Sequence, residues 1–302
     1  MPNLAIVAYK GSQQSALFGL GEMFDVANRL VDEDRGAQVA HQILTPSDVE
    51  NAKNVDAIIL PPNLTGKRGD EDCALHHWIV HQHLAGTIIC AACAGSFWLG
   101  HAGILDGRPA TTHWALEEDF RLHFPKVHLT PEHILVDDND IVTAGGVMAW
   151  RDLGYHLIWR WLGPTVVSQT CRQMLIDPTG REQRNYRSFR PNMAHKNRAI
   201  RALQIWMEGN IEDDLSVGSL AFQAGLSVRS LHRKFLKSTG LSVNRYVQEL
   251  RVEKAKGLLE LTELTVSEIC WKVGYKDVSA FNRLFKSISG LSAGEYRHRF
   301  RI

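Results

Sequence analysis

The chain has 302 residues, of which 44% are hydrophobic and 22% charged. This is the composition of an ordinary globular protein, and it excludes disorder along the whole chain. The net charge of +1 is unevenly placed. Residues 195–302 hold 18 Lys and Arg against 11 Asp and Glu, or +7, which leaves 16 against 22, or −6, for residues 1–194. A basic C-terminal part on an acidic body indicates a polyanionic partner for that part.

The five cysteines are an odd number without the spacing of a disulfide framework, which fits a reducing compartment. Residues 1–3 lead directly into the strand-like run 4–8, with no basic segment before it and no cleavage site after it. No apolar run approaches the ~20 residues that span a bilayer. We therefore expect a soluble cytoplasmic protein that does not enter a membrane.

Residues 1–180 alternate short apolar runs with longer amphipathic ones, which is typical of a parallel sheet covered by helices. The expected strands are 4–9, 39–44, 57–60, 87–91, 134–136 and 141–144, and the expected helices are 18–31, 74–84, 96–102, 114–123, 147–161 and 164–175. The pattern predicts an α/β domain with a doubly wound, flavodoxin-like parallel sheet.

Residues 181–197 are polar and basic and contain proline, so they indicate an interdomain linker. From residue 198 onward no strand signal remains. The pattern predicts an all-α domain over residues 198–302.

Within that domain a helix-turn-helix pattern occurs twice, about fifty residues apart. In the first copy a short helix ends at Ala224, Gly225 permits a tight turn, and Ser227 caps the next helix. Gly274 repeats the turn in the second copy. The matched positions that follow are Leu231, Arg233 and Phe235 in the first copy, and Phe281, Arg283 and Phe285 in the second. Two such units predict a protein that binds double-stranded DNA.

Leu231 and Phe235 share one face of their helix and must be buried, so the opposite face is left for a partner. Arg can pair with guanine and Asn with adenine in the major groove, and Lys or Ser near a helix start can contact phosphate. The predicted DNA-contacting residues are Arg229, Ser230, His232, Arg233 and Lys234 in the first copy, and Lys276, Ser279, Asn282, Arg283 and Lys286 in the second. Asp277 is expected to cap a helix.

Residues 243–261 join the copies and have the apolar spacing of a helix. Nineteen residues at 1.5 Å each span roughly 28 Å, near the ~34 Å between successive major grooves on one side of a duplex. A rigid spacer is the natural interpretation. A helical module that binds protein remains an alternative, because basic helix faces are often simply solvated.

A family resemblance supports the DNA-binding interpretation. Besides the matched positions, it is carried by Leu220-Ala221, Gly240-Leu241-Ser242, Tyr246, Arg251, Ile269, Gly274-Tyr275 and Tyr296-Arg297. With them, about the last hundred residues resemble the AraC/XylS family of transcriptional regulators, which implies control of promoters. The chain departs from the family pattern at Val243 and Ala293, where a proline commonly follows the serine. Both positions open helices, so the departure is minor.

Cys93 follows a strand-like apolar run and precedes a helix that begins near residue 96. Ala91 and Gly95, two residues before and after it, have the small side chains that a sharp strand-to-helix elbow requires. Such a turn is expected to expose the thiol, and a helix N-terminus beneath it to lower the thiol pKa.

The segments 91–95, 102–107 and 110–114 resemble the PfpI-like branch of the glutamine amidotransferase-like superfamily, and more narrowly the sensor domain of GlxA-related regulators. The resemblance implies a catalytic-like pocket in which Cys93 is the elbow cysteine, His113 the nearby histidine, and Glu22 the acidic residue of the first helix. Gly145 lies in a glycine turn that borders the same pocket. Relatives respond to nitrogenous metabolites, which implies an amino acid or amine as effector.

Three interpretations of Cys93 remain open. It could be the nucleophile of a cysteine-dependent amidase or aldehyde-acting enzyme, with His113 as base and Glu22 tuning the thiol. It could line a sensor pocket, or it could serve packing alone. Fusion to a DNA-binding domain favours a sensor without enzyme activity. The family, and the usual pairing of DNA half-sites, imply a homodimer.

No cofactor or metal is expected. Nothing in the sequence resembles a phosphate loop. His77 and His81 stand one helical turn apart, as a zinc pair would, but no third ligand follows at zinc-site spacing. Solvated helix histidines are the favoured interpretation.

Overall fold

The computed structural model describes residues 1–31, 38–49, 52, 54–65, 73–177 and 181–301. They form two compact units, Met1–Gln183 and Arg184–Ile302. Each unit is described below by itself.

The first unit is built on a six-stranded sheet with the order β2-β1-β3-β4-β8-β7. Its strands are β1 (Asn3–Val7), β2 (Ala40–Leu44), β3 (Ala57–Leu60), β4 (Ile88–Ala92), β7 (Leu135–Asp138) and β8 (Ile141–Ala144). All neighbouring pairs are parallel except β7 and β8. The predicted doubly wound sheet is therefore confirmed, with an antiparallel strand at one edge.

The antiparallel edge has a simple cause. Only Asn139 and Asp140 separate β7 from β8, and a two-residue connection can join antiparallel strands but not parallel ones. Asn139 has φ +66°, a left-handed conformation that suits such a turn. A separate two-stranded parallel pair, β5 (Pro109–Ala110) with β6 (His128–Leu129), was not expected from the sequence.

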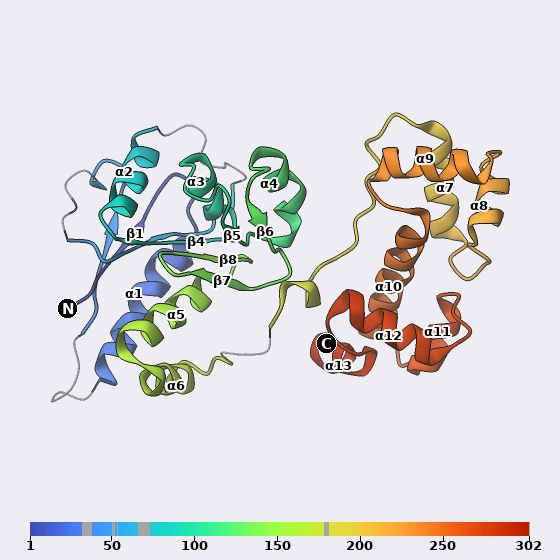
Figure 1. The fold of residues 1–302 in the computed structure, drawn as a ribbon. Helices are drawn as coiled ribbons and strands as arrows, with labels where there is room; N and C mark the ends of the chain where they lie inside the picture. Colours follow the sequence, from blue (N-terminus) through green and yellow to red (C-terminus); the bar gives the residue numbers. More distant parts are fainter. Residues whose placement is uncertain (32–37, 50–51, 53, 66–72, 178–180, 302) are drawn as a thin grey trace. The chain divides into compact units, whose positions relative to one another are not determined.

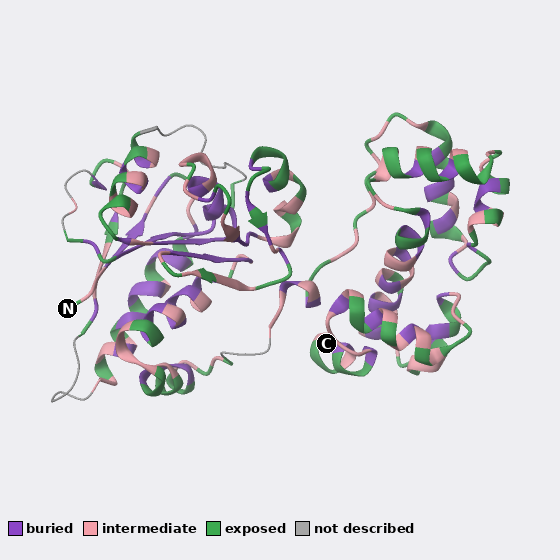
Figure 2. Cartoon of the chain, in the orientation of Figure 1, coloured by how far each residue is buried: buried purple, intermediate pink, exposed green. Residues whose placement is uncertain are grey.

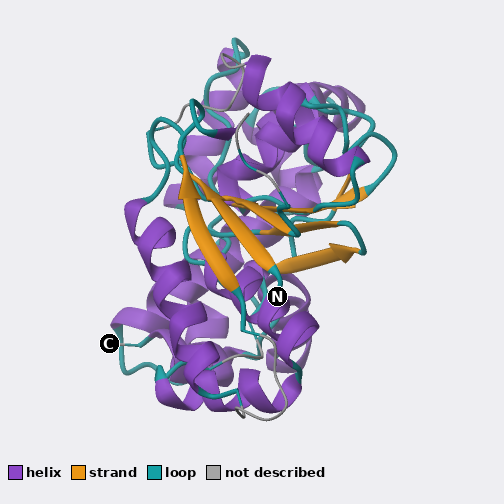
Figure 3. Cartoon of the chain, turned by 90° about the vertical axis from the view of Figure 1, so that its left-hand side faces the viewer, coloured by secondary structure: helices purple, strands orange, loops and turns teal. Residues whose placement is uncertain are grey.

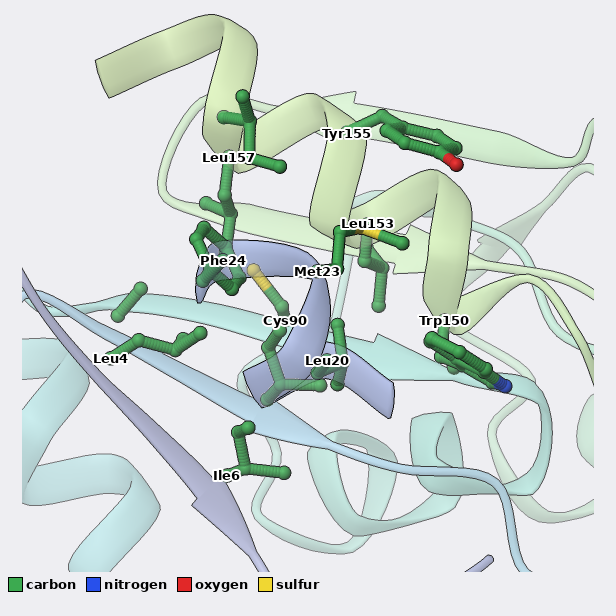
Figure 4. Close-up of a cluster of buried hydrophobic side chains, with 14 of the residues drawn as sticks. Leu4, Ile6, Leu20, Met23, Phe24, Cys90, Trp150, Leu153, Tyr155 and Leu157 are labelled. Atoms are coloured by element: carbon green, nitrogen blue, oxygen red, sulfur yellow. The ribbon is translucent and has the colours of Figure 1, made fainter. Parts of the chain in front are cut away.

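Helices cover both faces of the sheet (Figure 1, and from another side in Figure 3). One face carries α1 (Gln14–Arg29), α5 (Trp150–Leu162) and α6 (Pro164–Gln173), and the other α2 (Cys73–Leu84), α3 (Ser96–His101) and α4 (Glu117–His123). Because successive strand residues point to opposite faces, Leu4 and Ile6 pack against α1 and α5 while Ala5 and Val7 pack on the other side. Figure 4 shows the first of these cores.

The second unit contains helices and no strand among its described residues. Its helices are α7 (Arg198–Gly209), α8 (Val217–Gln223), α9 (Val228–Thr239), α10 (Val243–Leu261), α11 (Val266–Lys272), α12 (Val278–Ser289) and α13 (Ala293–Phe300). They enclose two apolar clusters, and α10 contributes to both, with Val247 and Leu250 in the first and Val252 and Leu259 in the second. Figure 2 shows these buried residues along the inner faces of the helices.

The turns of the two helix-turn-helix units follow the sequence signals. Ser227 begins α9 by accepting the N–H of Ser230, and Gly225 and Gly274 take φ values of +62° and +81° in the turns. Gly240 and Gly290 end α9 and α12 in the left-handed conformation that Gly adopts without strain. The duplicated helix-turn-helix fold is confirmed.

Candidate nucleic-acid interface and candidate ligand site

The free face of α9 carries the residues predicted to contact DNA. Leu231 and Phe235 are fully buried, whereas Arg229, His232 and Arg233 are exposed. Of the two flanking residues, Lys234 is half-buried. Ser230 is partly committed to the cap, because its hydroxyl oxygen accepts the Ser227 hydroxyl at 3.0 Å.

The equivalent face of α12 is polar but less basic. Phe281 and Phe285 are fully buried. The side chains on the outer face include Ser279, Arg283 and Lys286, which are exposed, and Asn282, which is half-buried; Lys276 is exposed just before the helix. Asp277 caps α12 by accepting the N–H groups of Ser279 and Ala280 at 2.8 and 3.2 Å, as predicted.

Three arginines on these faces are available to a partner. Throughout residues 184–301, the structure gives no hydrogen bond or ion pair to the side chains of Arg229, Arg233 or Arg283. A guanidinium with all five N–H donors unused can bind a phosphate or pair with guanine O6 and N7. Both helices therefore present free donors to a partner.

Cys93 lies at the sharp turn predicted for it. The residue follows β4 directly and has φ +56°, a left-handed conformation that side chains rarely adopt. A Cβ on Gly95 would collide with the carbonyl oxygens of Leu60 and Pro61, so only glycine fits there. The strand-to-helix elbow is confirmed.

The thiol itself differs from the expectation. Cys93 is only 4% exposed, and burial raises the pKa of its thiol to about 11, although the N–H groups of Ala94 and Gly146 oppose the shift. The predicted exposure and lowered pKa are wrong, because the loss of hydration destabilises the thiolate more than two N–H donors stabilise it. The thiol is protonated at neutral pH.

His113 follows Thr112, a residue bonded to Cys93, but the described structure gives its ring no hydrogen bond to the thiol. Its Nδ1 accepts the N–H of Ala115 at 3.0 Å, so the neutral ring carries its proton on Nε2, and burial lowers the pKa of the imidazole. Between these two described residues, Cys93 and His113, the structure gives no hydrogen bond. The neighbouring Thr112 does connect, because its Oγ1 donates to the carbonyl oxygen of Cys93 at 2.7 Å.

Of the other two expected residues, Gly145 reaches the elbow and Glu22 does not. Gly145 is adjacent to Gly146, whose N–H donates to the Cys93 thiol. Glu22 is exposed, on the face of α1 opposite to the buried Leu20 and Phe24. No contact in the described structure joins Glu22 to Cys93.

Gln13 is a site residue that the sequence reasoning missed. It precedes α1, its N–H donates to the Pro62 carbonyl after β3 at 2.8 Å, and its Nε2 bonds to Ser15 and to the sulfur of Met148. The side chain is 7% exposed, yet its Oε1 has no partner in the described structure. Gln13 thus lies at the carboxyl ends of the strands, near the β1–β3 switch point where open α/β sheets bind ligands. Its position directly after a predicted strand was the available signal.

Gln183 is the second missed residue, in the segment expected to be a linker. It is 2% exposed and begins the short helix η4 (Gln183–Asn185). Its Nε2 donates to the carbonyl oxygens of Thr112 and His133 at 2.8 and 2.9 Å, and its Oε1 accepts the Trp114 N–H at 2.8 Å. Nothing in the polar sequence around it signals burial.

A cavity of about 780 Å³ lies between α5 and α6, lined by Trp159, Val167 and Cys171 among others, and Cys93 is not among its lining residues. Within the described residues no three His, Cys, Asp or Glu side chains stand close enough to hold a metal ion. Of the helices described, none has the length and apolar character needed to cross a membrane.

Comparison with known proteins follows the same division. Residues 22–159 match the model of the DJ-1/PfpI family, and residues 220–299 match that of a helix-turn-helix domain. The HTH-type transcriptional regulator CdhR of Pseudomonas aeruginosa is 30% identical over 227 residues, which are 74% of this chain and 67% of CdhR. The chain belongs to the AraC-type regulators with a DJ-1/PfpI-type N-terminal domain.

Other members of this AraC-type family are similar over much of the chain. GbdR of P. aeruginosa is 26% identical over 259 residues, or 85% of this chain and 70% of GbdR, and GlxA of Rhizobium meliloti is 31% identical over 218 residues, or 71% and 66%. All three relatives are named HTH-type transcriptional regulators.

Solved structures support the fold of the α/β unit. A putative transcriptional regulator from Vibrio parahaemolyticus aligns with a TM-score of 0.51 at 18% identity, covering 58% of this chain and 98% of that one. An AraC family regulator from Pseudomonas putida gives 0.50 at 16% identity, covering 58% and 100%.

Proposed function

We propose that this AraC-type regulator binds a specific DNA sequence by laying α9 and α12 into successive major grooves of one duplex. The observation that carries the proposal is the match between the two units: each buries two apolar residues of its second helix and leaves an arginine without a partner, Arg233 and Arg283, at the same place on the outer face. The net charge of +7 in residues 195–302 supports a polyanionic partner.

The residue types suggest a division of labour. Arg233, Arg283 and Asn282 have the donor geometry that reads base edges, and we assign them to sequence recognition. The other exposed or half-buried positions are assigned to phosphates or to flanking bases: Arg229, Ser230, His232, Lys234, Lys276, Ser279 and Lys286.

We further propose that the α/β unit senses a small molecule at the carboxyl ends of β1, β3 and β4, through Gln13, Cys93, His113 and Gly145. Support comes from the Oε1 of Gln13, a buried acceptor without a donor. Such an atom accepts an N–H or O–H donor, and an amino acid or amine, the ligand class that we propose, supplies one. Glu22, on the exposed face of α1, is left out of this proposal.

A sensor fits this site better than a catalyst. A nucleophilic cysteine needs a thiolate and a base within reach, whereas this thiol has a pKa raised to about 11 and no hydrogen bond to His113. We propose that the site binds its ligand without turning it over. We also propose that the protein acts as a homodimer, and sedimentation of the full chain as a monomer at micromolar concentration would refute this.

The test of DNA recognition begins with selection of fragments from random DNA by the purified full-length protein. The proposal expects an enriched motif. When the selected fragment is footprinted with the bound protein, the protected bases should fall in two neighbouring major grooves. Enrichment of no motif would overturn it. For the sensor, a thermal-shift screen of amino acids and amines is expected to give a stabilising ligand whose effect is lost in Gln13→Leu and kept in Gln173→Ala, an exposed glutamine of α6.

A further inference from the structure

We propose that Gln183 couples the elbow site to the DNA-binding unit, so that a change at one is transmitted to the other through residues 183–185. This inference rests on the proposed function and adds the route by which the two activities are connected. It is drawn from two buried anchors, one in each unit, with a single residue between them.

The first anchor belongs to the α/β unit and lies two hydrogen bonds from Cys93. Gln183 Nε2 donates to the carbonyl oxygen of Thr112 at 2.8 Å, and Thr112 Oγ1 donates to the carbonyl oxygen of Cys93 at 2.7 Å. A Cβ on Gly145 would collide with the Gln183 amide, while the adjacent Gly146 donates its N–H to the Cys93 thiol. Gln183 therefore contacts both Thr112 and Gly145, the two residues that lie beside the Cys93 elbow.

The strained backbone of Cys93 makes its conformation sensitive to the contacts around it. A residue held at φ +56° stays there only while its surroundings hold it, and the Thr112 bond to its carbonyl is one of the contacts that do so. Removal of Gln183 frees Thr112, and a change in the conformation of Cys93 conversely alters the acceptors around Gln183. In the proposal, a change at either position therefore alters the surroundings of the other.

The second anchor belongs to the helical unit and fixes the end of α12. Asn185 is 2% exposed, and its Nδ2 donates to the carbonyl oxygen of Ser289, the last residue of that helix, at 2.9 Å. Its Oδ1 accepts from Arg299 at 3.2 Å. Gly290, the left-handed residue that ends α12, has no room for a Cβ beside Asn185 and Arg184. Asn185 thus holds the helix that we assign to base recognition.

Arg184 alone separates the two anchors. Consecutive residues span at most ~3.3–3.6 Å each, so the covalent path between the two anchors is short. We propose that a shift of Gln183 at the elbow is passed along the backbone of Arg184 to Asn185. Because coupling free energies are reciprocal, DNA binding must then change the environment of Cys93.

The experiment measures that reciprocal effect. Full-length protein is treated with iodoacetamide, with and without a saturating DNA fragment obtained by selection, and the alkylation rate of the peptide that contains Cys93 is followed by mass spectrometry. In the wild-type protein we expect the two rates to differ by at least about fivefold. Gln183→Ala and Asn185→Ala each remove one anchor. In both variants the ratio of the alkylation rates with and without DNA is expected to fall to about one at DNA saturation.

The matched control is Gln173→Ala, which removes an exposed glutamine from the same unit and is expected to keep the wild-type ratio. A wild-type ratio in Gln183→Ala or Asn185→Ala would overturn the coupling role, as would a ratio of one in the wild-type protein that still binds the DNA. Both results leave DNA recognition intact, whereas failure to select any DNA would refute the proposed function and the coupling together. If Gln183→Ala does not fold, Asn185→Ala in the other unit still decides the question.

Discussion

The two helix-turn-helix units have the same core and different outer faces. Phe235 packs edge-on against Tyr246 with ring centroids 5.1 Å apart, and Phe285 packs in the same way against Tyr296 at 5.5 Å. The outer face of α9 carries Arg229, His232, Arg233 and Lys234, whereas that of α12 carries Arg283 and Lys286 together with Ser279 and the half-buried amide of Asn282.

This difference indicates unequal roles for units with equal folds. Free cations attract phosphate wherever it lies, so α9 is suited to affinity that depends on salt. Amide and hydroxyl groups contribute little to that attraction and much to base discrimination, so α12 is suited to specificity. The predictions below test whether the two cores contribute equally to stability and whether the two outer faces contribute differently to DNA binding.

The largest effects are expected in the cores. Phe235→Ala and Phe285→Ala each remove a fully buried ring, and each should lower the free energy of unfolding by ~3–5 kcal/mol. Equilibrium denaturation should measure each loss of stability, and hydrogen exchange should locate it in the helix-turn-helix copy that carries the substitution. Leu236→Ala, at a position 55% exposed, should cost less than ~0.5 kcal/mol. A large effect from only one of the two phenylalanines would show that the cores are not equivalent.

The next effect concerns DNA affinity. Arg233→Ala and Arg283→Ala should each weaken binding to a selected fragment by ~1–3 kcal/mol and relax base preference, as measured by fluorescence anisotropy on matched and mismatched fragments. Arg229→Ala should instead weaken all sequences alike and reduce the salt slope by about one. Arg172→Ala, an exposed arginine of α6, serves as the control and should leave binding unchanged. Equal loss on all sequences in Arg283→Ala would contradict the assignment of α12 to specificity.

A smaller effect separates the caps of the two recognition helices. Asp277 accepts two backbone N–H groups, at 2.8 and 3.2 Å, and Ser227 accepts one, at 3.3 Å. Loss of a cap costs ~0.5–2 kcal/mol, so Asp277→Ala should destabilise the protein more than Ser227→Ala in chemical denaturation. Asp277→Asn keeps an acceptor at the cap and should recover most of the loss. The reverse order of the two alanine variants would rule out this account.

The smallest effect is a pH dependence that distinguishes the start of α13 from the start of α10. At the start of α13, Glu295 accepts the N–H and hydroxyl of Ser292, which lowers the pKa of its carboxyl below the usual 4.5. A lowered pKa in the folded state gives stability that is present above pH 4.5 and is lost as the pH falls through the folded value. The start of α10, where Arg245 occupies the equivalent position after Ser242, has no such carboxyl.

Hydrogen exchange at the first turns of α13 and α10 between pH 5 and 3, corrected for intrinsic rates, should therefore show loss of protection at α13 alone. Glu295→Gln, which keeps the oxygen acceptor and removes the titration, should abolish the difference. Equal loss at both helices would contradict the explanation.

The helical unit could be predicted closely because its signals are local. The boundaries of α10 follow from the Ser242 cap and the apolar period, and they agree with the expected range 243–261 residue for residue. The elbow at Cys93 was equally predictable, because the small residues that such a turn requires, Ala91 and Gly95, lie within two positions of it. The direction of β7, by contrast, depended on recognising that Asn139 and Asp140 form the whole turn to β8.

The chemistry of the elbow could not be predicted, because it depends on residues far away in the chain. The thiol pKa is set by burial in the folded unit and by the N–H of Gly146, and Gln183 contacts Thr112, a residue 71 positions earlier. The placement of Glu22 did have a local signal. Phe18, Glu22, Asp25 and Arg29 recur at helical spacing and are all exposed, a pattern that marks the outer face of α1.

The nineteen-residue α10 fixes the rotation of one helix-turn-helix copy relative to the other as well as the distance between them. One residue inserted in it would turn the second unit by ~100° about the helix axis, and the two outer faces could no longer follow a single duplex. Seven inserted residues make nearly two full turns and add ~10 Å, about the rise of three base pairs. The length of one helix therefore sets both the separation and the relative orientation of the two outer faces, and with them the bases that this protein can contact together.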